Sequence, residues 1–153
     1  MYINFETTFI LLTCYLVGSV PFGLMLSKLL NKNDPRLVGS KNIGATNIVR
    51  TSGWKIGLLT LIFDTLKGFI PVMVLKNHLI EQSLIILFIF LGHLFPIWIK
   101  FRGGKGIAVI IGCLFGYKFI YGLVYILIWL IIAVVTKYSS LSALFASVSI
   151  LIL

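Results

Sequence analysis

The sequence contains very little acidic charge: only 4 of its 153 residues are Asp or Glu, against 13 Lys and Arg. Charged residues together make up 11% of the chain and hydrophobic residues 59%, a balance that a soluble domain of this length does not have. The scarcity of charge therefore excludes the soluble classes and predicts an integral membrane protein. Because the cations are spread over several turns and form no basic soluble face, nucleic acid is excluded as a partner.

Reactive and metal-binding patterns are also missing. The two cysteines, Cys14 and Cys113, lie inside apolar stretches, which is typical of small core residues rather than of a disulfide or of metal ligands. The chain contains no HxxxxD pair, no GxSxG nucleophile elbow and no HExxH zinc helix. We therefore expect no metal and no cofactor, so that any reaction rests on the binding and positioning of substrates.

Long apolar runs dominate what is present. A hydrocarbon core of about 30 Å needs roughly 20 apolar residues of helix, and unpaired backbone is too costly in lipid for irregular structure. The first run carries Glu6 and follows no basic cluster, so we expect a retained span and not a cleaved signal peptide. Pro21, with a glycine on either side, predicts a kink in this run. The predicted helices are 7–30, 54–75, 83–99, 106–116, 119–136 and a shorter 141–153.

These segments predict an all-α fold, a polytopic membrane helix bundle that forms one domain over residues 1–153. About six segments are expected, the last one cut short. Basic residues concentrate in the connections 31–53 and 100–105, whereas 76–82 and 117–118 carry few. Because connections on the cytoplasmic side are enriched in Lys and Arg, this distribution places both basic connections inside and the N-terminus outside.

The first basic connection contains GSKNIGATNIVR, residues 39–50. Its glycines permit close backbone approach, its short polar side chains form hydrogen bonds, and its arginine offers a bidentate fork. This set suits an anion with several oxygens, although an ordinary polar turn with helix caps has the same composition. The candidate residues are Ser40, Asn42, Gly44, Thr46, Asn47 and Arg50.

The second basic connection contains FRGGKG, residues 101–106. Gly103, Gly104 and Gly106 allow successive backbone N–H groups to point at one oxyanion. Lys105 adds a point charge, and the apolar helix that follows presents its N-terminal dipole. The pattern indicates a phosphate-binding turn, but not a Walker A loop, because GxxxxGK[ST] is absent. The alternative is a positive-inside anchor whose glycines form a tight turn.

Three ionisable residues lie inside the predicted spans. Asp64 and Lys67 are three residues apart, so they share a helix face and are expected to pair, to neutralise each other and to brace the cytoplasmic loop. His93 precedes Pro96 and is expected to face the same polar pocket as the glycine turn, either as a candidate base or as a buried core residue.

Three motifs together carry a family resemblance. GSKNIGATNIVR, DTLKG at 64–68 and GHLFPIWIKFRGGKG at 92–106 resemble the bacterial acyl-phosphate:glycerol-3-phosphate acyltransferase family, the PlsY type. VGSVPFG at 17–23 is similar to the first helix of that family. The resemblance covers residues 10–115 by motif and the rest by apolar pattern, and three ordered motifs are more specific than any one of them.

The resemblance implies a small seven-helix enzyme of phospholipid biosynthesis. It would transfer a fatty acyl group from acyl phosphate to the 1-hydroxyl of sn-glycerol 3-phosphate, giving lysophosphatidate and phosphate without coenzyme A. Such an enzyme would be a monomer in the cytoplasmic (inner) membrane, with its active site facing the cytoplasm. The residues that match the family's motifs are Ser40, Arg50, Lys105 and His93 as catalytic residues, and Asn42, Gly44, Thr46, Asn47, Gly103, Gly104 and Gly106 as substrate-binding residues.

Two other interpretations compete with this one. A small transporter or channel for an organic phosphate would also use glycine turns, intramembrane charges and an anion pocket, although no inverted repeat is visible in the sequence. A non-catalytic membrane scaffold would leave both anion motifs unexplained. The family also continues through a seventh helix and a basic tail resembling RHxxNIxRLxxGxE, whereas this sequence stops at SVSILIL. We therefore expect either a chain truncated at its C-terminus or a shortened variant of the family.

Overall fold

The computed structural model of the protein describes residues 4–150, and all of its regular structure in this range is helical. The all-α prediction is therefore confirmed. The elements are α1 (Phe5–Ser19), α2 (Phe22–Leu29), α3 (Ala45–Ser52), α4 (Trp54–Val74), α5 (Gln82–Leu94), the short 3₁₀ helix η1 (Ile97–Ile99), α6 (Ile107–Tyr117), α7 (Phe119–Thr136) and α8 (Ser139–Ile150).

The membrane segments agree closely with the predicted ones. Within the described range, α4, α7 and the segment from α5 through η1 are each long and apolar enough to cross a membrane. α1 and α2 pass the same test only as a pair, bent by 42° at the break that contains Pro21, so the predicted kink is confirmed. The predicted division at 117–118 is confirmed as well, because α6 ends at Tyr117 and α7 begins at Phe119. The predicted last segment overlaps α8, and its residues 151–153 lie outside the described range.

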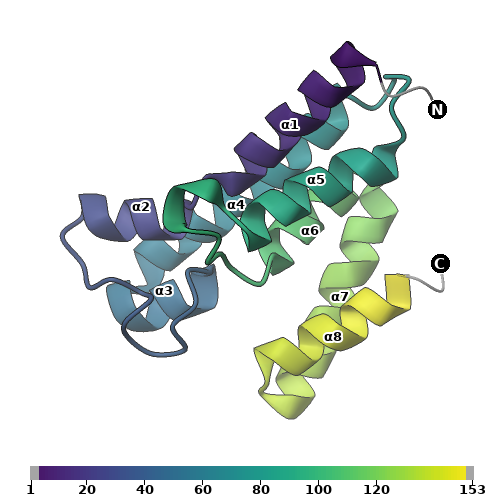
Figure 1. The fold of residues 1–153 in the computed structure, drawn as a ribbon. Coiled ribbons are helices and arrows are strands. Elements are labelled where there is room, and N and C mark those ends of the chain that lie inside the picture. Colours follow the sequence, from purple (N-terminus) through teal and green to yellow (C-terminus); the bar gives the residue numbers. More distant parts are fainter. Residues whose placement is uncertain (1–3, 151–153) are drawn as a thin grey trace.

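The helices pack mainly in pairs. α1 lies along α5, and α4 lies along α6, so that these four helices form the centre of the bundle (Figure 1). α7 and α8 form a hairpin at the side of it, joined to the bundle through the contact of α7 with α6. The short α3 packs on the first part of α4, next to α2. The loop after α2 and the turn after η1, which are distant in sequence, thus lie on two sides of one cleft.

Glycines set the spacing within both central pairs. A Cβ atom on Gly68 of α4 or on Gly112 of α6 would overlap a backbone carbonyl group of the facing helix. The same is true of Gly18 in α1 and Gly92 in α5. In a membrane the hydrophobic effect does not drive helices together, so close backbone packing at small residues supplies much of their attraction. The two helix pairs therefore depend on these four positions.

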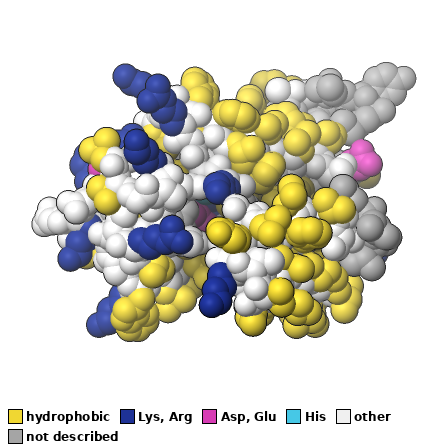
Figure 2. Space-filling view, turned by 90° about the horizontal axis from the view of Figure 1, so that it is seen from below, with side chains coloured by type: hydrophobic (Ala, Val, Ile, Leu, Met, Phe, Trp, Pro, Cys, Tyr) yellow, Lys and Arg dark blue, Asp and Glu magenta, His cyan; other side chains and the backbone are white. Residues whose placement is uncertain are grey.

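The cationic side chains gather at one end of the bundle. Figure 2 shows Lys and Arg over the half of the molecule that contains α2 and α3, while apolar side chains cover the half that contains the ends of α1 and α8. The acidic Glu6 lies at the opposite end from α2, and its carboxylate is 3.5 Å from His78. The molecule thus has one strongly basic end.

Replacement of a glycine in a central helix pair tests this packing. Gly112→Ala places a methyl group against the Thr65 carbonyl, and overpacking of this kind costs about 1–3 kcal/mol. We expect a clearly lower midpoint of thermal unfolding in detergent micelles. The matched control is Val134→Ile, which adds one carbon to a side chain that is 75% exposed on α7 and leaves the midpoint unchanged. Equal midpoints for the two variants would contradict a close contact between α4 and α6.

Candidate functional site

Asn47 organises the connection between α2 and α3. Its side chain is 2% exposed, and its amide nitrogen lies 2.8 Å from the Pro35 carbonyl oxygen, 3.1 Å from that of Val38 and 2.9 Å from that of Asn42. Its amide oxygen accepts a hydrogen bond of 2.9 Å from the backbone N–H of Ser40. Every polar atom of this side chain is therefore used within the protein, which makes Asn47 a residue that shapes the loop.

Other residues of the same segment remain exposed on its surface. Ser40 is exposed just before α3, and Thr46 and Arg50 are exposed within it. Thr46 and Arg50 are four residues apart and so lie on one face of α3. Asn42 is only partly buried, and its side-chain oxygen accepts a 3.0 Å hydrogen bond from the N–H of Gly44. The structure thus divides the predicted residues into exposed polar groups and a buried group that holds the loop.

The glycine turn after η1 is attached to the end of α5. The N–H of Gly103 donates to the Leu94 carbonyl at 3.1 Å, and the N–H of Gly104 donates to the His93 carbonyl at 3.2 Å. The expectation that these two N–H groups point at an oxyanion is therefore wrong, because both already have protein acceptors. A Cβ atom on Gly103 would overlap the His93 carbonyl, so this position requires glycine for close approach. The assignment of Gly103 and Gly104 to the substrate site stays a prediction.

The end of the turn leads into α6. Lys105 is exposed, and Gly106 takes a left-handed conformation, with φ of 78°, directly before the first residue of the helix. A glycine adopts this conformation without the steric penalty that a side chain brings. Lys105 thus stands at the N-terminal end of α6, where the helix dipole also favours an anion. This part of the predicted arrangement is present.

A buried cluster of charged and polar groups joins three elements behind the turn. The Lys67 ammonium lies 2.8 Å from Asp64 Oδ1, so the predicted pair within α4 is confirmed, and both side chains are 3% exposed. The same nitrogen lies 2.7 Å from the Val20 carbonyl oxygen and 3.0 Å from His93 Nδ1. The other side of the His93 ring packs against Gly104, as a Cβ atom there would overlap Nε2. The prediction that His93 faces the glycine turn is confirmed, whereas its contact with Lys67 was not foreseen.

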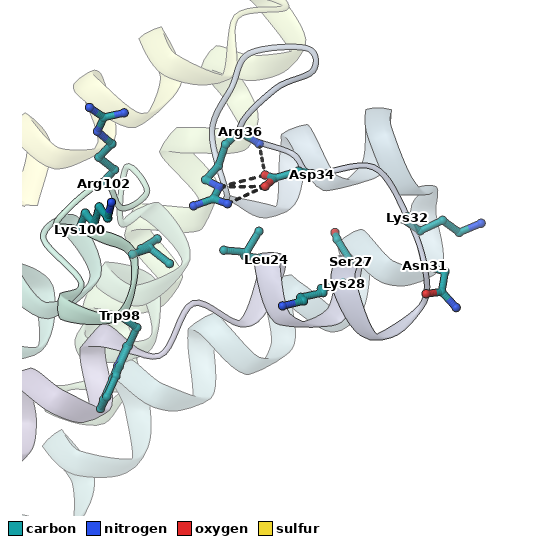
Figure 3. A pocket seen from close by; sticks show the side chains of 11 residues that line it. Leu24, Ser27, Lys28, Asn31, Lys32, Asp34, Arg36, Trp98, Lys100 and Arg102 are labelled. Atoms are coloured by element: carbon teal, nitrogen blue, oxygen red, sulfur yellow. Dashed lines mark hydrogen bonds and ion pairs between the residues drawn. The ribbon is translucent and has the colours of Figure 1, made fainter.

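An open cleft of about 890 Å³ separates the first basic connection from the second (Figure 3). One wall comes from α2 and the loop after it, and the other from η1 and the start of the glycine turn. Nothing in the sequence indicates that the cations of this lining, which orient the chain in the membrane, share a cleft. None of the predicted substrate-binding residues lies in this lining. The residues that line it are Leu24, Ser27, Lys28, Asn31, Lys32, Asp34, Arg36, Trp98, Ile99, Lys100 and Arg102.

Asp34 and Arg36 form an ion pair in this cleft. The shortest contact, between Arg36 Nη2 and Asp34 Oδ2, is 2.6 Å, and the backbone N–H of Arg36 also donates to Asp34 at 2.9 Å. The hydrogen bonds from the guanidinium group lower the pKa of the Asp34 carboxyl below its usual value. The other four cations of the lining have no ion-pair partner within residues 4–150. The cleft therefore keeps a strong positive potential.

A smaller cavity of about 200 Å³ lies between α6, α7 and α8. Lys105 and Gly106 are at one side of it, and most of its other residues are apolar, among them Phe90 and Leu144. An anionic group near Lys105 thus has an apolar space next to it. Across the described part of the chain, no three His, Cys, Asp or Glu side chains lie close enough together to bind a metal ion.

A pair of Asn→Asp substitutions tests the role of Asn47. Asn47→Asp replaces the amide donor by an oxygen that faces three carbonyls, and a buried polar group that loses its partner costs about 1–3 kcal/mol. We expect a lower unfolding midpoint and faster proteolysis of the segment 31–44. The control, Asn42→Asp, keeps the oxygen that accepts from Gly44 and is expected to resemble the wild type. Equal behaviour of both variants would contradict the role given to Asn47.

Comparison with known proteins gives a consistent result. A family model described as "Glycerol-3-phosphate acyltransferase" matches residues 8–153. The glycerol-3-phosphate acyltransferase of Bartonella quintana (strain Toulouse) is 49% identical over 150 residues, which are 94% of this chain and 71% of the relative. That of Ehrlichia canis (strain Jake) is 43% identical over 149 residues, covering 95% of this chain and 78% of the relative.

Solved structures match the fold. The crystal structure of PlsY (YgiH), an integral membrane glycerol 3-phosphate acyltransferase, in its glycerol 3-phosphate form has a TM-score of 0.89 and 37% sequence identity to this chain. The alignment covers 95% of this chain and 74% of that one. The lysophosphatidic acid form of PlsY has a TM-score of 0.86 at 35% identity, with the same coverage. Sequence and fold together lead to one conclusion: this chain is an integral membrane protein of the glycerol-3-phosphate acyltransferase family.

Proposed function

We propose that the protein transfers a fatty acyl group from acyl phosphate to the 1-hydroxyl of sn-glycerol 3-phosphate, giving lysophosphatidate and inorganic phosphate. The observation that carries this proposal is the family match over residues 8–153, together with the similarity of the fold to PlsY. The similar PlsY structures contain glycerol 3-phosphate in one form and lysophosphatidic acid in the other, which are the acceptor and the product of this reaction. Both substrates carry a phosphate group, which suits a basic site.

The chemistry requires positioning more than it requires a protein nucleophile. An acyl phosphate is already activated, so the acceptor hydroxyl attacks the acyl carbon, a C–O bond forms to it, and the bond from that carbon to the phosphate oxygen breaks. The hydroxyl proton passes to the leaving phosphate. The protein must hold two anions with the hydroxyl about 3 Å from the acyl carbon. Cations and hydrogen-bond donors then stabilise the charge that develops on the transferred group.

The exposed residues of the two segments are suited to this task. Arg50 and Lys105 are the cations that we assign to the two phosphate groups, and Ser40 and Thr46 add exposed hydroxyl donors in the same segment as Arg50. Asn42, Gly44, Gly103, Gly104 and Gly106 complete the substrate-binding set that the motifs predict. Asn47 acts in this scheme by holding the loop that carries Ser40. The apolar cavity next to Lys105 suits the first carbons of an acyl chain.

The location in the cell follows from the distribution of charge. The basic end of the bundle favours the cytoplasmic side of the membrane, because positively charged connections are retained there. We therefore assign the site to the cytoplasmic surface of the inner membrane and the N-terminus to the outside. We assign residues 1–153 to a single membrane domain that works as a monomer. The alternative of an organic-phosphate transporter is not supported, since the related proteins are named as acyltransferases.

A comparison of acyl donors tests the proposed reaction. The purified protein, reconstituted in lipid and given glycerol 3-phosphate, is expected to make lysophosphatidate and free phosphate from palmitoyl phosphate. It is expected to make none from palmitoyl-CoA, because the family resemblance implies acyl phosphate as the donor. Product from the CoA donor alone would contradict the acyl-phosphate mechanism. Absence of product from both donors would contradict an acyltransferase function for this chain.

Removal of the two assigned cations tests the site. Lys105→Ala and Arg50→Ala are each expected to lower kcat/KM by about 100-fold, the size of effect seen when a donor to a developing charge is removed. Lys76→Ala removes an exposed lysine from the connection after α4 and serves as the control, with a rate close to the wild type. All three proteins should unfold at similar temperatures. Near-normal rates for the first two would remove Lys105 and Arg50 from the site.

A further inference from the structure

The Lys67 ammonium is surrounded by three acceptors from three parts of the chain. Asp64 Oδ1 lies 2.8 Å away on the same helix, the Val20 carbonyl oxygen 2.7 Å away at the break between α1 and α2, and His93 Nδ1 3.0 Å away on α5. An ammonium group has three N–H donors and no acceptor. Two hydrogen-bond partners are present, the Val20 carbonyl and His93 Nδ1, while the Asp64 carboxylate lies at ion-pair distance and its Oδ1 makes no hydrogen bond. Lys67 and Asp64 are also the only two oppositely charged side chains that meet inside the described bundle. The geometry thus matches a charged lysine.

This arrangement determines the proton position on His93. A nitrogen that lies 3.0 Å from an ammonium donor must offer its lone pair, so Nδ1 carries no proton. A doubly protonated ring would direct an N–H group at the cation, which is unfavourable. A neutral Lys67 could accept a proton from Nδ1 instead, but Asp64 would then either keep its charge without a counter-charge or take up a proton, and in both cases the ion pair would be lost. The ring is therefore neutral, with its proton on Nε2.

The protonated side of the ring faces the glycine turn. Nε2 packs against Gly104, and the backbone of the same two residues is joined by the hydrogen bond from the Gly104 N–H to the His93 carbonyl. Nε2 makes no hydrogen bond to another residue in the range 4–150. The N–H of this nitrogen is thus a donor without a protein acceptor, directed at the turn that carries Lys105.

We propose that Lys67 is a positioning residue that fixes His93 as the neutral Nε2–H tautomer, so that His93 serves acyl transfer as a hydrogen-bond donor to a substrate oxygen and not as the general base. The second half of this proposal rests on the proposed function, whereas the tautomer does not. A ring in this state has no lone pair directed at the turn and cannot accept the hydroxyl proton there.

The tautomer is measured directly by nitrogen NMR. The chain contains two histidines, so His78→Asn protein labelled with ¹⁵N-histidine gives a signal from His93 alone. In micelles at pH 7 we expect an unprotonated Nδ1 and a protonated Nε2. The opposite tautomer, or protons on both nitrogens, would overturn the assignment. In Lys67→Met, where the ammonium is gone, we expect the signal to change to a mixture of the two tautomers, and an unchanged signal would contradict the role of Lys67.

Kinetics separate a donor from a base. His93→Gln keeps an acceptor for Lys67 and an N–H donor for the turn but has no basic nitrogen, so kcat with palmitoyl phosphate is expected to stay within about tenfold of the wild type. His93→Met has neither the acceptor for Lys67 nor the N–H donor, and its kcat is expected to fall by about 100-fold or more. If His93 were the general base, both variants would lose it, and kcat would fall by about 10²–10⁴-fold in both. Equal large losses, or no loss in either, would therefore overturn the donor role.

Failure of the proposed function and failure of the tautomer assignment give different experimental results. A wild-type protein without acyltransferase activity would contradict the proposed function, while the NMR signal of the wild-type ring would still decide the tautomer. Conversely, an active wild type with the wrong tautomer would overturn this inference and leave the proposed function intact. Because the NMR measurement needs only the His78→Asn protein, it does not depend on whether the Lys67 variant folds.

Discussion

One buried ammonium group connects the parts of this structure that matter for function. The Lys67 ammonium forms an ion pair with Asp64 on the same helix. It also contacts the Val20 carbonyl oxygen at the break between α1 and α2 and the ring of His93 on α5. A buried charge is tolerated in a bundle only where each of its donors has a partner, and its removal leaves the other groups uncompensated. This side chain thus connects the bend of the first span and the end of α5 to α4, in addition to the direct packing of these helices.

The two segments of the site are built on different supports. The glycine turn is attached to α5 through the carbonyl groups of His93 and Leu94, whereas the loop before α3 is shaped by the amide of Asn47. In both cases the groups that hold the backbone are buried, whereas the cations that we assign to the phosphate groups, Arg50 and Lys105, are exposed. Such a division keeps the substrate-binding side chains on a rigid frame, which favours positioning as the source of catalysis.

The helices were largely predictable from the sequence, since apolar length and the cost of unpaired backbone in lipid decide them locally. The predicted 54–75 and 119–136 agree with α4 and α7, and Pro21 marks the bend between α1 and α2. The contact of Lys67 with His93 was not predictable, because it spans 26 residues and depends on how α4 and α5 lie. The hydrogen bonds of Gly103 and Gly104 were not predictable either. A glycine permits the close approach of an oxyanion or of a protein carbonyl, and the sequence does not distinguish the two. The basic cleft, too, appears only once the loop after α2 and the turn after η1 are seen to face each other.

We propose that catalysis in this protein consists of holding two phosphate-bearing substrates together, and that the acyl group is never bound covalently to the protein. A single-turnover experiment with radiolabelled palmitoyl phosphate, quenched at successive times and separated into protein and lipid, tests it most directly. The account predicts that label moves from the donor to lysophosphatidate only when glycerol 3-phosphate is present, and that the protein never carries it. Label that appears on the protein before it appears in lysophosphatidate would contradict the account.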